Sequence, residues 1–173
     1  EEQKADSSIV QIPDFLALKL KLSCKDLEYK KFHASNTKGE VLFADNNLFL
    51  HNVNMEVMDG SMKLNCRIHK NNKDSWQAIS NADFKGIDIK ELFIQFSDFG
   101  QNYFTHKNIK GRADADVQSS FIFNPDGTIK MEDLVILGDL KIRDGEIMDY
   151  KPIQKLAGFI KIKKMEHLTF TEL

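Results

Sequence analysis

Residues 16–24 read Leu16-Ala17-Leu18-Lys19-Leu20-Lys21-Leu22-Ser23-Cys24, and large apolar side chains alternate with small or charged ones. A period of two places every second side chain on the same face of an extended chain. The stretch therefore predicts a long β-strand with one apolar face and one polar face.

The same alternation continues through most of the chain. Segments with the composition of tight turns separate the runs, at residues 36–39, 45–47, Asp59-Gly60 and Asp144-Gly145. The alternation slips at His51-Asn52, which predicts a β-bulge at that point. We expect further strands at residues 40–44, 48–58, 62–68, 75–84, 109–123, 128–136, 140–142 and 160–163.

Two segments depart from this pattern. Apolar residues from Ile89 to Phe96 follow helical spacing, Asp88 is placed to cap the helix with Glu91 three residues on, and Gly100 is placed to end it. A second short helix is expected from Asp149 or Tyr150 to Gly158.

The order of these elements lacks the alternation of strand and helix that builds a parallel sheet. The residues alone therefore predict a mainly β fold with two short helices, arranged as a long antiparallel meander. Its strands carry more apolar surface than two short helices can cover. The remaining surface must pack on itself, meet a neighbouring domain or hold an apolar ligand.

Composition narrows the function. The chain has 173 residues and a formal net charge of −2, which argues against a nucleic-acid-binding protein because such a protein needs a cationic surface. No apolar run approaches the ~20 residues of a membrane span. Residues 1–14 are interpreted as a linker remnant cut from a longer chain, followed by a single β domain over residues 15–173.

Motifs for catalysis or metal binding are missing from the sequence. Asp114 and Asp116 form a D-x-D pair, but the glycine and glutamate of a calcium loop do not follow them. Cys24 and Cys66 form no C-x-x-C motif and are interpreted as buried thiols, with a disulfide as the alternative. We therefore expect a protein that is not an enzyme and holds neither a metal nor a cofactor. The histidines are scattered: His33, His51, His69, His106 and His167.

Four segments taken in order resemble the C-terminal region of AsmA-family proteins, the group that includes the TamB-like envelope proteins. They are LFLHNVNMEVMDGSMKL at residues 48–64, ADFKGIDIKELF at 82–93, IKGRADAD at 109–116 and LGDLKIRDGEI at 137–147. Each is a strand pattern interrupted by glycine, and the second segment continues into the first five residues of the expected helix, Ile89 to Phe93. The resemblance covers about residues 16–173.

This resemblance implies a curled antiparallel sheet that forms a groove or half-barrel. It also implies a protein anchored in the inner membrane by a segment outside this sequence, which extends into the periplasm of a Gram-negative cell. Its partners would be phospholipid acyl chains and outer-membrane proteins. Its role would be lipid transport that supports assembly and homeostasis of the outer membrane. No enzymatic activity is implied.

Two functional hypotheses follow. In the first, the apolar face lines a lipid-binding groove; in the second, the domain has a closed core, binds no ligand and serves as a structural or protein-interaction module. An apolar groove can hold acyl chains at roughly 0.8 kcal/mol per buried CH₂. The residues expected to face lipid under the first hypothesis are Leu16, Leu18, Leu20, Leu22, Met55, Val57, Met62 and Leu64.

Overall fold

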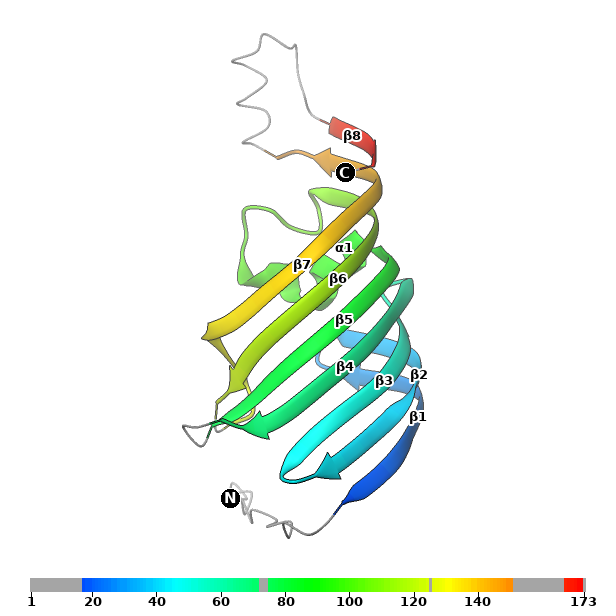
Figure 1. Ribbon diagram of the computed structural model, residues 1–173. Helices are drawn as coiled ribbons and strands as arrows, with labels where there is room; N and C mark the ends of the chain where they lie inside the picture. The colour runs from blue at the N-terminus through cyan, green and yellow to red at the C-terminus, as the bar shows by residue number, and fades with distance from the viewer. Residues whose placement is uncertain (1–16, 72–74, 125, 151–166, 173) are drawn as a thin grey trace, which may run out of the picture.

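The computed structural model describes residues 17–71, 75–124, 126–150 and 167–172. Eight antiparallel strands form one sheet, in which each strand pairs with its neighbours in sequence (Figure 1). The predicted antiparallel meander is therefore confirmed. The strands are β1 (Leu18–Tyr29), β2 (Phe32–Ala44), β3 (Asn47–Val57), β4 (Gly60–Lys70), β5 (Trp76–Asp88), β6 (Ile109–Phe123), β7 (Ile129–Met148) and β8 (His167–Glu172).

One α-helix lies between β5 and β6. Helix α1 (Ile89–Gln95) begins as predicted, because the Asp88 carboxylate accepts a hydrogen bond of 3.1 Å from the backbone N–H of Glu91. It ends earlier than expected, since Asp98 and Phe99 adopt left-handed backbone angles within the short 3₁₀ segment η1 (Ser97–Gly100). The second predicted helix and the predicted strand at 160–163 fall largely or wholly on residues outside the described ranges.

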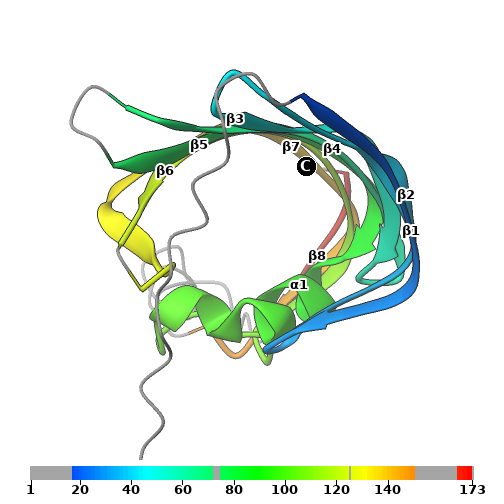
Figure 2. The same cartoon turned by 90° about the horizontal axis from the view of Figure 1, so that it is seen from below.

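The sheet curls so that α1 lies across the open side of the curl (Figure 2). Bulges in four strands carry a residue with a left-handed φ, at Asn36, Asn52, Gly86 and Asp144, with φ values of 49°, 47°, 59° and 49°. Such bulges bend a strand and increase its twist. The bulge predicted at Asn52 is confirmed.

Two predicted turns are wrong. Residues 36–39 belong to β2, and Asp144-Gly145 belongs to β7, which runs without interruption over the two strands predicted at 128–136 and 140–142. In both places the left-handed residue makes a bulge instead of reversing the chain. The turn between β3 and β4 also lies one residue earlier than predicted, at Met58-Asp59, both with positive φ.

The buried core lies under α1, at one end of the strands. Ile89, Leu92 and Phe93 of this helical segment pack on residues from the ends of β3, β5, β6 and β7 that are close to it. Burial of this surface is what fixes the helix on the sheet, because a helix of seven residues is marginal in isolation. The buried cluster consists of Ala34, Val53, Met55, Val57, Met58, Ile87, Ile89, Ile109, Ala113 and Ile142.

Candidate functional site

The face of the sheet that carries α1 is the concave face (Figure 2). Rows of small or apolar side chains cross this face from strand to strand. Backbone register defines each row, because residues that pair across antiparallel strands point to the same face. One row contains Cys66 and a serine pair, whose hydroxyls hydrogen-bond at 2.7 Å. This row runs Leu20, Val41, Leu50, Cys66, Ser80, Ser119 and Ile136.

Burial along the concave face is uneven. Near α1, Val53, Met55 and Val57 are only 2% to 7% exposed. On the outer strands β1 and β7 of the same face, four large aliphatic side chains are 45% to 59% exposed. Helix α1 covers one end of the strands. Over the rest of the apolar face the inner strands are half-buried, and the outer strands β1 and β7 are open to solvent. The four exposed residues are Leu18, Leu20, Ile136 and Leu140.

The structure divides the eight residues expected to face lipid into distinct environments. Met55 and Val57 belong to the core beneath α1, whereas Leu18 and Leu20 are exposed on the concave face. Leu16 lies outside the described residues. The other three are half-buried and pack against the core cluster: Leu22, Met62 and Leu64.

Strand β7 contributes two exposed residues to the concave face that the sequence-based set does not contain. Ile136 pairs with Ser119 and Leu140 pairs with Ala115, so both extend the apolar surface to the last long strand. The signal for Ile136 in the sequence is the run Leu134-Val135-Ile136-Leu137, in which apolar residues occupy both faces. A continuous run does not tell which of its residues faces inward.

The convex face carries an ionic clamp at the bulge of β5. Arg143 donates two hydrogen bonds to the Asp114 carboxylate, at 2.6 and 2.9 Å, and Asp114 also accepts one of 2.7 Å from the backbone N–H of Gly86. Arg112 donates to the backbone carbonyls of Asp59 and Gly86, at 2.8 and 3.0 Å. These contacts tie the β3–β4 turn, the β5 bulge, β6 and β7 together.

Acidification is expected to weaken this clamp. The hydrogen bonds from Arg143, followed by the one from the Gly86 N–H, lower the pKa of Asp114 to about 2. A carboxylate whose folded-state pKa is lowered stabilises the protein at neutral pH, and this contribution disappears as the pH falls from about 4 to about 2. We expect Asp114→Asn to lower the melting temperature at pH 7 and to flatten its fall over that window, as followed by circular dichroism. Asp116→Asn, on the same strand face, is the control and should behave as the parent; equal pH profiles for Asp114→Asn and the parent would contradict the prediction.

Within the described part of the chain, no three His, Cys, Asp or Glu side chains are grouped to hold a metal ion. Cys24 and Cys66 are both free and half-buried, and burial raises the pKa of the Cys66 thiol. No helix among the described residues has the length and hydropathy of a membrane-spanning segment. The described residues of the concave face offer an apolar surface for binding.

Comparisons of the chain with protein-family models, with curated proteins and with solved structures find no match.

Proposed function

We propose that the protein is a non-enzymatic, lipid-binding segment of an AsmA-like protein of the periplasm, anchored to the inner membrane by a segment outside this sequence. In this proposal its curled sheet forms a groove that binds or conducts phospholipid and so supports outer-membrane homeostasis. The observation that supports it is the row of small or apolar side chains that continues across seven strands of the concave face, with large aliphatic side chains open to solvent on the outer strands β1 and β7.

Acyl chains suit this surface for two physical reasons. Each buried CH₂ group contributes roughly 0.8 kcal/mol to binding. An acyl chain of lipid length is therefore stabilised by several kcal/mol on an apolar surface, without any specific contact. Hydrophobic contact is non-directional, so a chain can move along the row with little change in free energy. The concave face presents only one satisfied polar pair in the middle of this row, Ser80 and Ser119.

Mass spectrometry of lipid extracted from the protein tests the proposal. The protein is purified without detergent from a host with phospholipid membranes, and phospholipid is expected in stoichiometric amount. The double variant Leu20→Asp with Leu140→Asp should lose this lipid while it keeps the circular dichroism spectrum of the parent, because both side chains are exposed on the concave face. Ile79→Asp places the same charge at an exposed residue of the convex face and should keep the lipid. Absence of lipid from the folded parent protein would contradict the proposal.

A second function, a structural module that pairs with a neighbouring protein, is favoured by the edge at β7. Strand β8 pairs with residues 143–148 of β7, so residues 129–142 form an edge of the described sheet. Four side chains along that edge, Met131, Val135, Ile136 and Leu137, are 55% to 66% exposed. An apolar edge strand can receive an added strand from a partner. A lipid-free protein that forms a stable complex through this edge would support the second function.

A further inference from the structure

The far end of α1 carries a group of exposed aromatic rings. We call Tyr29, Phe96 and Phe99 the aromatic tip; their side chains are 45% to 64% exposed. Phe96 and Phe99 stack with their ring centroids 5.8 Å apart, and Phe32 meets Phe96 edge-on at 6.4 Å. The tip therefore joins the β1–β2 hairpin to the segment that follows α1, two parts of the chain that are far apart in sequence.

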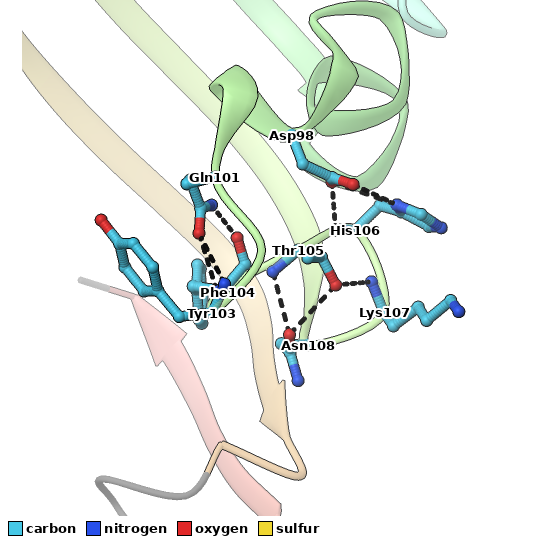
Figure 3. Close-up of polar contacts among 8 residues, drawn as sticks. All are labelled: Asp98, Gln101, Tyr103, Phe104, Thr105, His106, Lys107 and Asn108. Atoms are coloured by element: carbon cyan, nitrogen blue, oxygen red, sulfur yellow. Dashed lines mark hydrogen bonds and ion pairs between the residues drawn. The ribbon is translucent and has the colours of Figure 1, made fainter.

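Polar contacts hold the segment that displays these rings (Figure 3). Asp98 accepts hydrogen bonds from the backbone N–H of His106 at 2.7 Å and from its ring Nδ1 at 3.1 Å. Gln101 binds both backbone polar groups of Phe104. Thr105 donates to Asn108, which in turn donates to the Met148 carbonyl at 3.1 Å. Because these contacts fix the backbone, the exposure of Phe99 is a property of the folded loop.

Lysines accompany the rings. Lys30 and Lys31 form the turn of the β1–β2 hairpin, and the Lys30 ammonium lies 5.4 Å from the centroid of the Tyr29 ring. Hydrogen bonds from His106, backbone N–H first, lower the pKa of Asp98, and Lys31 adds to this effect. The Asp98 carboxylate is thus already engaged, and Lys30 and Lys31 are exposed cations beside the rings. Hydrogen bonds from Thr128 lower the pKa of Asp126, and Lys30 adds to this effect, so one carboxylate lies near this lysine pair.

We propose that the aromatic tip docks this protein on the surface of a membrane that contains anionic lipids. Transfer of a Phe side chain from water to the boundary of the acyl chains is favourable. Tyr rings suit the interface because one end of the ring is apolar and the other is polar. Lysine stems can lie along the apolar layer while their ammonium groups reach the phosphates. The patch is small, rigid and aromatic and has exposed lysines beside it, which matches that environment. This inference rests on the tip and its charges and does not depend on lipid binding at the concave face.

Vesicle flotation of the full chain tests docking. With vesicles of phosphatidylcholine and phosphatidylglycerol the protein should float, and with pure phosphatidylcholine much less of it should. Raising the ionic strength from about 0.15 M to about 1 M should release protein, because the Debye length falls from about 8 to about 3 Å. Flotation that is independent of lipid charge and of salt would overturn the proposed role of the lysines, and no flotation on either vesicle would overturn docking altogether.

Variants assign the binding to the tip. The double variant Phe96→Ser with Phe99→Ser should lower the apparent partition constant at least about tenfold, since burial of a Phe side chain contributes more than 1.4 kcal/mol. Lys30→Gln with Lys31→Gln should bind more weakly and lose most of the salt dependence. Val135→Ser with Leu137→Ser removes exposed apolar side chains from the β7 edge and is the matched control, expected to float as the parent does. If this control loses as much vesicle binding as the Phe96→Ser with Phe99→Ser variant, the assignment of membrane binding to the aromatic tip is wrong.

A fluorescent tryptophan tests whether the rings of the aromatic tip are free to contact a membrane or are covered by another part of the protein. In a Trp76→Phe background, Phe99→Trp should emit as a solvent-exposed indole in buffer and shift to shorter wavelength with anionic vesicles. Emission typical of a buried indole in buffer alone would show that protein covers the tip and would overturn the inference. If stoichiometric lipid is bound but the protein does not bind vesicles, docking is rejected and the proposed function stands. If the protein binds vesicles but carries no bound lipid, the proposed function is rejected and docking stands.

Discussion

Val57→Asp is expected to unfold the protein. Val57 is 3% exposed in the cluster beneath α1, and it pairs with Gly60 and Ala34 on strands to either side. An ionised carboxylate in this position has no cationic partner in the cluster, since all ten members are apolar. The cost of burying an unpaired charge is several kcal/mol, a large part of the 5–15 kcal/mol that stabilises an ordinary domain. Circular dichroism at 25 °C should show loss of β structure or a protein recovered only from inclusion bodies.

Leu20→Asp is the matched comparison. The same change at a residue of the same sheet face, but 49% exposed, leaves the charge in water and should lower the melting temperature by only a few degrees. Leu64→Asp should fall between the two, because Leu64 is half-buried against the core cluster. Equal stability of Val57→Asp and Leu20→Asp would contradict the division of the concave face into a covered and an open part.

Gly60→Ala is expected to have the second-largest effect. A Cβ atom at Gly60 would lie 2.5 Å from the Lys85 carbonyl oxygen and 2.7 Å from the Gly86 carbonyl carbon and oxygen. Both neighbours are backbone, and Arg112 holds the Gly86 carbonyl in place from the convex side at 3.0 Å. No rotamer change can relieve the overlap. We expect a loss of about 3 kcal/mol or more in the free energy of unfolding, measured by urea denaturation.

The neighbouring change Ser61→Ala serves as the control. Ser61 is exposed on the adjacent position of β4 and should change the free energy of unfolding by less than about 0.5 kcal/mol. A wild-type urea midpoint for Gly60→Ala would mean that the β3–β4 turn can move away from the β5 bulge, against the contacts that Arg112 makes to both.

Alternation and capping residues allow most of the fold to be predicted. The strand predicted at 109–123 coincides with β6, and the cap at Asp88 forms with the expected partner, Glu91. The slip of phase at Asn52 correctly predicts a bulge. These features succeed because each depends on residues within a few positions of one another in the chain.

Bulges at Asn36 and Asp144 were mistaken for turns for an identifiable reason. Asn, Asp and Gly favour left-handed backbone angles, and both a tight turn and a bulge use them. The choice between the two depends on whether the next residues continue the ladder with a neighbouring strand. At Asp144 they do, because β6 continues opposite, with Ile109 facing Ile147. That pairing partner lies more than thirty residues away and leaves no local signal.

The residues predicted to face lipid also show that local sequence patterns do not reveal long-range packing. Alternation correctly assigns Leu20 and Met55 to the same sheet face, but it cannot tell that α1 covers Met55 and leaves Leu20 in solvent. Coverage is decided by where a seven-residue helix folds back on the sheet, which depends on long-range packing. The aromatic tip was missed because each Phe in residues 92–104 could equally belong to a core.

Strand order has a consequence for how the chain acquires its structure. Every strand pairs with the strand before it in sequence, and the two longest connections, between β5 and β6 and between β7 and β8, are each about twenty residues long. Loop closure is therefore cheap at each step, and folding should be faster than for sandwich proteins of similar size, whose strands pair across long separations. As the chain leaves the ribosome, each new hairpin can dock on the edge left by the previous one. Beyond the outer edge of β1, the growing sheet then exposes only the edge of its newest strand, which limits the aggregation that partly folded β proteins otherwise risk.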